Sequence, residues 1–247
     1  MICTTPRSGS TLLCGLLSAT RVAGMPASHF HTPSLAGWLK AYGLDHAIYA
    51  SERDAARAVL DAGIARGKGS NGVFGLRMQR DSFMFFMSQA DLLCPGLATD
   101  RARLEALFGP TLLIYLRRDD GLAQAVSLVV AKQTGLWHRN ADGSELERQG
   151  RPGAPCYDAS AIAQHVAELT ALNAAWEAWF SREKLTPFRV TYEAHSNDPR
   201  GVLADLLAAL SLDPSLADAV PIPTARLADA TNASWIDRFR ATAPGQD

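Results

Sequence analysis

The chain alternates short, continuous apolar runs with longer segments whose apolar residues recur at helical spacing. Four short runs are rich in β-branched or aromatic residues, which predicts strands. These are residues 2–5, 73–78, 111–116 and 188–192. The longer segments tend to begin at Ser, Thr or Asp and end at Gly or Pro, as helices do. They predict helices over residues 10–17, 51–67, 81–93, 100–108, 119–134, 158–184, 199–211 and 235–240.

This alternation is typical of parallel β-α-β units joined by right-handed crossovers. We therefore expect an α/β fold in which a central parallel sheet carries helices on both faces. Ligands of such sheets bind beyond the carboxyl ends of the strands. The segments that follow the four strands, at Pro6, Met78, Arg117 and Glu193, should meet at that edge.

Three segments interrupt the pattern. Residues 21–42 are rich in Gly, Pro, Ser and His, and they predict a loop of the kind on which sites are built. Residues 136–157 are polar and contain several Gly and Pro, so we interpret them as a mobile loop or a partner-binding excursion. Residues 213–247 are expected to pack back on the core. We expect a single domain that spans residues 1–247.

Composition narrows the class of protein. The chain has 247 residues, of which 47% are hydrophobic and 20% charged, values typical of a globular domain. A net charge of −1 provides no long-range attraction for nucleic acid or anionic membranes, so neither is expected as a partner. We find no signal peptide and no apolar run of membrane-spanning length, which predicts a cytoplasmic protein without a transmembrane segment. The four cysteines show no metal-binding spacing.

The first predicted strand leads into a loop with the chemistry of an anion site. Pro6 cannot continue a strand ladder, and Gly9 allows a sharp bend. Ser10 or Thr11 is expected to cap the next helix. Backbone N–H groups and the positive helix end then point to one place, where a phosphate is the most natural ligand. The loop is not a Walker A motif, because no lysine precedes Ser10 and the nearest cation is Arg7.

A further group of polar residues follows the third predicted strand. Arg118 follows that strand at the ligand edge, and Ser127 lies on the next helix. A guanidinium fork and a hydroxyl are suitable donors to a phosphate dianion. Taken alone, residues 117–120 are equally compatible with a solvated turn.

These motifs resemble those of sulfotransferases that use 3′-phosphoadenylyl sulfate (PAPS). The similarity covers nearly the whole chain and points to the bacterial family of trehalose and lipopolysaccharide sulfotransferases. It is carried by PRSGSTLL at 6–13, VAGMP at 22–26, GVFGLRM at 72–78, RDDGLAQAVS at 118–127 and the tail at 235–240. The resemblance implies a P-loop-like three-layer fold. It also implies a carbohydrate sulfotransferase that moves a sulfuryl group from PAPS to a hydroxyl of a carbohydrate or glycolipid.

The resemblance further implies roles for individual residues. The 5′-phosphate of the nucleotide would be held by Arg7, Ser8, Gly9, Ser10 and Thr11. The 3′-phosphate would be held by Arg118 and Ser127. No metal is implied, because the arginine and the helix end supply the countercharge. Arg226 lies in a further similar segment, and we interpret it as a surface residue.

The acceptor side departs from the family. The relatives carry a glutamate shortly after the Gly-x-Pro at residues 24–26, and no carboxylate stands there in this chain. His29 and His31 lie on the same segment and are our candidates for the general base, His29 first, because an imidazole suits that work at neutral pH. Arg77 stands where relatives have lysine and is a candidate to bind the sulfuryl oxygens. Trp137 is a candidate wall for a sugar ring.

Two other functions are compatible with the sequence. A P-loop-like kinase or NTPase is disfavoured by the missing Walker lysine and by the lack of a clear Mg²⁺-binding aspartate. A non-catalytic nucleotide-binding relative is compatible with the missing glutamate. The sequence does not identify the acceptor, and a homodimer is one candidate for the oligomeric state.

Overall fold

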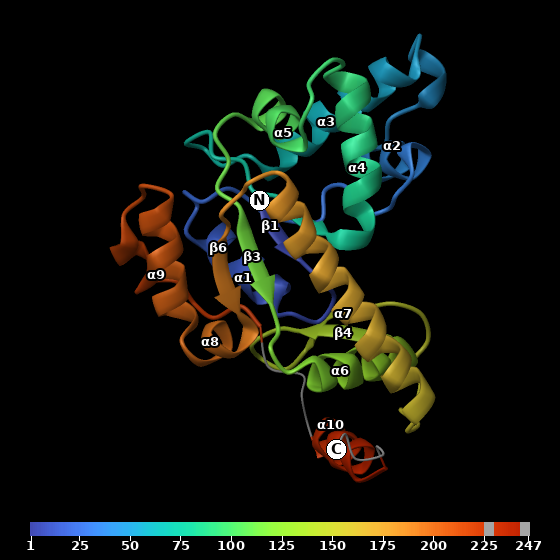
Figure 1. The fold of residues 1–247 in the computed structure, drawn as a ribbon. Helices are drawn as coiled ribbons and strands as arrows, with labels where there is room; N and C mark the ends of the chain where they lie inside the picture. The colour runs from blue at the N-terminus through green and yellow to red at the C-terminus, as the bar shows by residue number, and fades with distance from the viewer. Residues whose placement is uncertain (225–229, 243–247) are drawn as a thin grey trace.

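Four parallel strands form the centre of the protein (Figure 1). The structure is a computed structural model that describes residues 1–224 and 230–242. The sheet has the order β2-β1-β3-β6. Its strands are β1 (Ile2–Thr4), β2 (Arg77–Gln79), β3 (Ile114–Arg117) and β6 (Phe188–Thr191). The prediction of an α/β fold with a central parallel sheet is confirmed.

Helices cover both faces of the sheet, because successive side chains of a strand point to opposite sides. Ile2 and Leu116 pack into one cluster with helices α1 and α9. Cys3 and Tyr115 belong to a second cluster with helices α3, α4 and α7. Figure 1 shows α7 crossing in front of the sheet and α1 behind it, which makes three layers. The helices mentioned in this paragraph are α1 (Ser10–Ala19), α3 (Glu52–Gly67), α4 (Arg80–Leu93), α7 (Ala159–Arg182) and α9 (Pro199–Ala209). Two further helices are α5 (Asp100–Phe108) and α6 (Gly121–Thr134).

Most helix ends agree with the polar signals in the sequence. Ser51, Thr99 and Asp158 cap α3, α5 and α7, because each side chain accepts a backbone N–H of the first turn. Gly135 ends α6 with a φ of 70°, a left-handed conformation that costs glycine little. Local sequence therefore determines where these helices begin and end.

Several predicted boundaries were wrong. The second strand was predicted over residues 73–78, but the observed strand β2 covers only Arg77–Gln79. Residues before it form isolated bridges, such as the one between Lys68 and Phe74. Residues 21–42 are not loop throughout, since Ser34 caps a further helix, α2 (Leu35–Tyr42). A short helix, α8 (Tyr192–Asn197), follows β6 directly and was not predicted.

Residues 136–157 contain a β-hairpin where a loop was predicted. Strand β4 (Leu136–Arg139) pairs antiparallel with β5 (Glu145–Arg148). Gly143 lies between them with a φ of 84°, as the left-handed residue that completes a three-residue hairpin loop between Asn140 and Ser144. The prediction of a loop rested on the polar composition of the segment, which is typical of loops but is also compatible with a solvent-exposed hairpin. The mobility of the segment stays a prediction.

The C-terminal helix α10 (Ala230–Thr242) packs on α6, at the bottom of Figure 1. Trp235 is buried there in a cluster with Val126 and Val129. Arg226, interpreted above as a surface residue, lies outside the described residues. None of the described helices combines the length and the apolar character that crossing a membrane requires.

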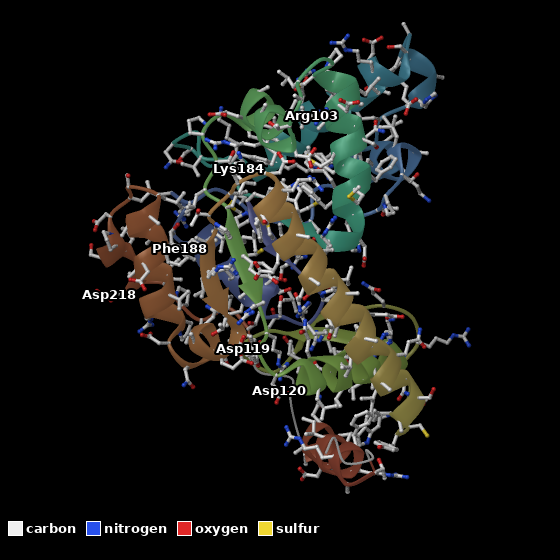
Figure 2. The ribbon with its side chains drawn as sticks, in the orientation of Figure 1. Arg103, Asp119, Asp120, Lys184, Phe188 and Asp218 are labelled. Atoms are coloured by element: carbon white, nitrogen blue, oxygen red, sulfur yellow. The ribbon has the colours of Figure 1, made fainter. Side chains whose placement is uncertain are left out.

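The carboxyl ends of the four strands share one edge of the sheet. In Figure 2, Asp119 and Asp120 mark this edge where β3 leads into α6, whereas Lys184 and Phe188 mark the opposite edge. Trp176 of α7 donates its indole N–H to the carbonyl of Thr4 at 2.9 Å, which fixes the end of β1. The loop that follows β1 is therefore held in place from inside the fold.

Candidate active site

The loop between β1 and α1 has the backbone of an anion site. Arg7 and Gly9 have φ values of 63° and 84°, so the chain turns through two left-handed residues. A Cβ added to Gly9 would lie 2.8 Å from Cδ2 of Tyr192, so a larger residue does not fit without displacing that ring. Close packing and left-handed geometry thus both favour glycine at this position.

The first turn of α1 receives no side-chain cap. Its N-cap residue is Gly9, which has no side chain that can accept a hydrogen bond, and its first turn contains no acidic residue. The expectation that Ser10 or Thr11 caps this helix was therefore wrong. The N–H groups at this positive helix end remain suited to an anion, as in phosphate-binding loops.

Buried hydrogen bonds hold the loop from beneath. Gln124 of α6 donates its side-chain amide to Thr5 Oγ1 at 3.0 Å and to the carbonyl of Pro6 at 2.6 Å. The hydroxyls of Thr4 and Ser8 pair with each other, and Ser8 is fully buried. The Ser8 side chain therefore supports the loop, and what Ser8 can offer a ligand is its backbone N–H.

A cavity of about 700 Å³ opens over this loop, a size typical of small-molecule sites. Its walls come from the loop, from the ends of β2 and β3, from α6 and α8, and from the hairpin. They include most of the residues predicted to bind nucleotide or acceptor, namely Arg7, Gly9, Ser10, Thr11, His31, Arg77, Arg118, Ser127 and Trp137. The structure thus brings together residues from both predicted phosphate motifs.

Arg7 joins the two motifs directly. Its Nε donates to Ser127 Oγ at 3.0 Å, and its Nη1 donates to the carbonyl of Trp137 on the hairpin. Burial, and then the nearby charge of Arg118, lower the pKa of Arg7 to about 10. Arg7 therefore stays cationic at neutral pH, and an anion in the cavity would relieve the repulsion between the two guanidinium groups.

Arg118 lies over the ring of Tyr192, with its guanidinium carbon 4.3 Å from the ring centroid. Its Nε is buried and makes no hydrogen bond within the described residues. A buried donor without a partner is costly, so an acceptor supplied by a ligand would be stabilising here. Glu193, next to Tyr192, accepts the backbone N–H groups of Asp119 and Asp120 and ties α8 to the start of α6.

Arg77 reaches from β2 to the loop on the other side of the cavity. Its Nη1 donates to Thr11 Oγ1 at 3.0 Å, and its Nε donates to Ser28 Oγ at 2.9 Å. Thr11 Oγ1 also lies 2.9 Å from Nε2 of His138 on the hairpin. Arg77 and His138 therefore meet at the hydroxyl that stands at the beginning of α1.

The two histidines proposed as bases lie in different surroundings. His31 lines the cavity, whereas His29 is absent from its walls. Nε2 of His29 is 3.1 Å from the carbonyl of Met25, and its ring stacks on Phe74 with centroids 5.9 Å apart. Burial is the main reason why the pKa of His29 is lowered. The structure does not bring His29, our first candidate, to the site.

Several polar residues of the cavity wall were given no individual role from the sequence, among them His138, Glu147 and Asp81. His138 and Glu147 lie on the hairpin, and Asp81 lies in the first turn of α4. The Asp-Gly turn between two short runs was the available signal for the hairpin pair. The position of Asp81, directly after β2 at the ligand edge, was the signal for that residue. No group of His, Cys, Asp and Glu suited to holding a metal ion occurs in the part of the chain that the structure describes.

His195 is a buried histidine next to the loop. It belongs to α8, is fully buried beside Gly9, and neither ring nitrogen has a hydrogen-bond partner within the described residues. Burial lowers the pKa of His195 to about 4. The imidazole is therefore neutral in the folded protein at neutral pH.

We expect this histidine to make the protein acid-sensitive. Its folded-state pKa lies below the unfolded value of about 6.5, so the unfolded chain takes up the proton first. Its contribution to stability is complete above about pH 6.5 and is lost as the pH falls towards 4, by up to about 3 kcal/mol. Urea unfolding at pH 7 and pH 4.5 should show a smaller loss for His195→Leu than for the unsubstituted protein. The exposed His46→Gln serves as control, and equal losses in all three proteins would contradict the assignment.

The parallel sheet, the arginine-bearing loop before the uncapped end of α1 and the cavity above them define a P-loop-like α/β protein with a candidate anion site. The chain belongs to the Stf0 sulphotransferase family, whose family model matches residues 1–242. The predictions of the family and of a sulfotransferase are thereby confirmed, and the kinase or NTPase alternative gains no support.

Two curated relatives match nearly the full length of the chain. The trehalose 2-sulfotransferase of Mycobacterium tuberculosis (strain Erdman) is 29% identical over 99% of this chain and 95% of its own length. The trehalose 2-sulfotransferase of Mycolicibacterium smegmatis is 30% identical over 98% of this chain and 94% of its own length. Coverage of this extent includes every segment that forms the cavity.

Proposed function

We propose that the protein transfers a sulfuryl group from PAPS to a hydroxyl of a carbohydrate, with trehalose as the first acceptor to test. The observation that carries this proposal is the cavity in which the uncapped end of α1, Arg7 and Arg118 face one another. Two cations and a free helix end match a ligand with two separate phosphate groups. The names of the two relatives support the choice of acceptor.

The described residues fit the nucleotide donor. Arg7 and the N–H groups of residues 8–11 would bind its 5′-phosphate at the positive end of α1. Arg118, whose buried Nε has no hydrogen-bond partner among residues 1–224 and 230–242, would bind the 3′-phosphate, with the nearby hydroxyl of Ser127. PAPS supplies an activated sulfuryl group when it is bound. The chain itself provides charge stabilisation on the phosphate side, which does not depend on a metal ion.

The opposite side of the cavity suits a sugar. Ser28, Gln79 and Asp81 offer hydroxyl, amide and carboxylate groups that exchange hydrogen bonds with hydroxyls. Trp137 contributes an aromatic wall, and it also packs against the cluster formed by α6 and α10. Arg77 lies between these groups and the loop and would contact the sulfuryl oxygens. A glycolipid acceptor would present the same sugar chemistry with an added lipid chain.

The direct experiment is transfer of label from ³⁵S-labelled PAPS to trehalose, with a lipid-linked glycan extract as a second acceptor. Labelled product that depends on acceptor supports the proposal. Nucleotide binding without turnover on either acceptor would favour the alternative of a non-catalytic relative. Transfer to the lipid-linked acceptor alone would replace trehalose by a glycolipid.

Binding of the reaction product should stabilise the protein. At a concentration 100-fold above its Kd, adenosine 3′,5′-bisphosphate should add about 2.7 kcal/mol to the free energy of unfolding, because it binds the folded chain alone. Thermal unfolding with and without the bisphosphate measures this as a rise in Tm. ATP with Mg²⁺ should raise Tm less, since it lacks a 3′-phosphate for Arg118. Equal shifts with both nucleotides, or no shift with the bisphosphate, would contradict the assigned phosphate sites.

A further inference from the structure

The site as described lacks an assigned proton acceptor. The second loop carries no carboxylate after Gly24-Met25-Pro26, and His29 lies outside the cavity. A general base must come within hydrogen-bond reach of the acceptor hydroxyl, either directly or through one water. Under the proposed function, that hydroxyl attacks next to the 5′-phosphate at the start of α1. The base is therefore to be sought among the groups that contact this part of the loop.

The hairpin supplies such a group. Nε2 of His138 lies 2.9 Å from Thr11 Oγ1, in the first turn of α1, and the same hydroxyl accepts a hydrogen bond from Arg77. His31 and Asp81 also line the cavity, but no hydrogen bond joins either side chain to the loop within the described residues. Of the imidazole and carboxyl groups His31, Asp81 and His138 in the cavity wall, His138 is thus the one that is hydrogen-bonded next to the expected reaction centre.

His138 has a carboxylate beside the same nitrogen. It stands opposite Glu147 in the hairpin register, and Glu147 Oε2 is 3.6 Å from His138 Nε2. Both side chains line the cavity, and both are partly exposed. The negative charge of the Glu147 carboxylate would stabilise the imidazolium that forms when Nε2 is protonated.

We propose that His138, assisted by Glu147, is the general base of the sulfuryl transfer. This rests on the proposed function. The oxygen of the acceptor forms a bond to sulfur as its proton passes to Nε2 of His138. The bond between sulfur and the 5′-phosphate oxygen breaks, and its electron pair stays on that oxygen, next to Arg7. The products are the sulfate ester, the bisphosphate and an imidazolium stabilised by Glu147. The imidazolium later releases its proton to water.

Charges around the imidazole make this base depend on the nucleotide. His138 is faced by Arg7 from the loop, by Arg77 from β2 and by Glu147 from β5. Burial and then Arg7 lower the pKa of His138 to about 4, Glu147 raises it, and Arg77 lowers it further. An anionic nucleotide offsets both arginines, so its binding should raise this pKa. The imidazole then becomes a stronger base when the donor is in place.

The first test is the pH dependence of turnover. His138→Gln should lower kcat by roughly 10²–10⁴-fold, the usual contribution of a general base. Affinity for the bisphosphate should stay within a few-fold, since the phosphate ligands are intact. The kcat profile of the unsubstituted enzyme should rise with pH through the pKa of His138 in the complex. That acid limb should lie at higher pH than the limb of kcat/KM, which reports the free enzyme.

The Glu147→Gln variant distinguishes a carboxylate that assists the general base from one that makes only a structural contact. Removing the carboxylate should move the acid limb of kcat to lower pH, because the charge that raises the imidazole pKa is lost. The Glu147 side chain is 44% exposed on the hairpin, so this substitution should leave the fold intact. An unmoved limb in Glu147→Gln would overturn the role of Glu147.

A second readout requires no turnover. Titration of the histidine ring protons by NMR should show the pKa of His138 rise when adenosine 3′,5′-bisphosphate is added, because the anion offsets Arg7 and Arg77. The ring resonances of the exposed His46 serve as the internal reference. The His138→Gln spectrum identifies the resonance, and near-identical melting temperatures confirm that the variant is folded. A His138 pKa that does not move on nucleotide binding would overturn the proposal.

The outcomes distinguish the two levels of inference. Failure of the bisphosphate to bind would overturn the proposed function, and the base assignment with it. Turnover with full kcat and an unchanged acid limb in His138→Gln would overturn the base assignment and leave the sulfuryl transfer standing. Loss of that limb in His31→Gln instead would assign the base to His31.

Discussion

Replacing Arg7 by glutamine is expected to lower kcat by roughly 10²–10³-fold, the cost of removing one donor that stabilises charge in a transition state. The oxygen that leaves sulfur gains negative charge next to the guanidinium, so the interaction strengthens as the bond breaks. Affinity for the bisphosphate should fall as well, because the product carries a full phosphate at the same place. Steady-state kinetics at saturating PAPS and direct binding of the bisphosphate measure the two effects separately.

Arg7→Lys is the informative companion to this variant. Lysine keeps the charge but cannot donate to both Ser127 and the carbonyl of Trp137 in the planar geometry of the guanidinium. Its kcat should therefore lie between that of Arg7→Gln and that of the unsubstituted enzyme. If Arg7→Gln changes KM for PAPS and leaves kcat intact, Arg7 binds the donor without stabilising the leaving oxygen.

Replacing Arg118 by alanine is expected to weaken bisphosphate binding by roughly 10–100-fold, as one or two charge-assisted hydrogen bonds are lost. The phosphate it would bind does not react, so kcat at saturating PAPS should change little. Isothermal titration of the bisphosphate, followed by kinetics at saturating donor, tests both statements. A fall in kcat with unchanged KM would reverse the roles of Arg118 and Arg7.

Arg117 provides a matched control in the adjacent position. Its side chain is about half exposed, pairs with Asp119 at 3.0 Å and does not line the cavity. Arg117→Ala removes the same charge from the same turn, so its effect on bisphosphate affinity should be small and sensitive to salt. A loss as large as that of Arg118→Ala would mean that general electrostatics, rather than a specific contact, attract the nucleotide.

The order of strands and helices was predictable because the signals for it are local. Short β-branched runs predict the strands, and Ser51, Thr99 and Asp158 cap helices through bonds to residues three positions away. Alternation of these elements then leaves a parallel sheet as the solution that buries both faces. For the same reason the loop from Pro6 to Thr11 was placed correctly at the carboxyl edge.

Short elements were harder to predict, because the signals within them are weak. β2 has three residues, and its position is set by pairing with β1 rather than by its own composition. The hairpin of β4 and β5 carries few apolar residues, so its stability depends on contacts such as Thr11 with His138 and Arg7 with Trp137. The polar composition of this hairpin therefore predicted a loop.

The amino-acid sequence by itself determined the class of fold, the position of the loop between β1 and α1 and the arginines available to bind anions. The tertiary structure decided which of these groups meet. Arg7 and Ser127 are 120 positions apart and form one contact, and His138 reaches Thr11 across 127 positions. Such pairs depend on how a hairpin and a helix pack over the sheet edge. No local pattern encodes that packing, because each contact needs the whole sheet to be assembled first.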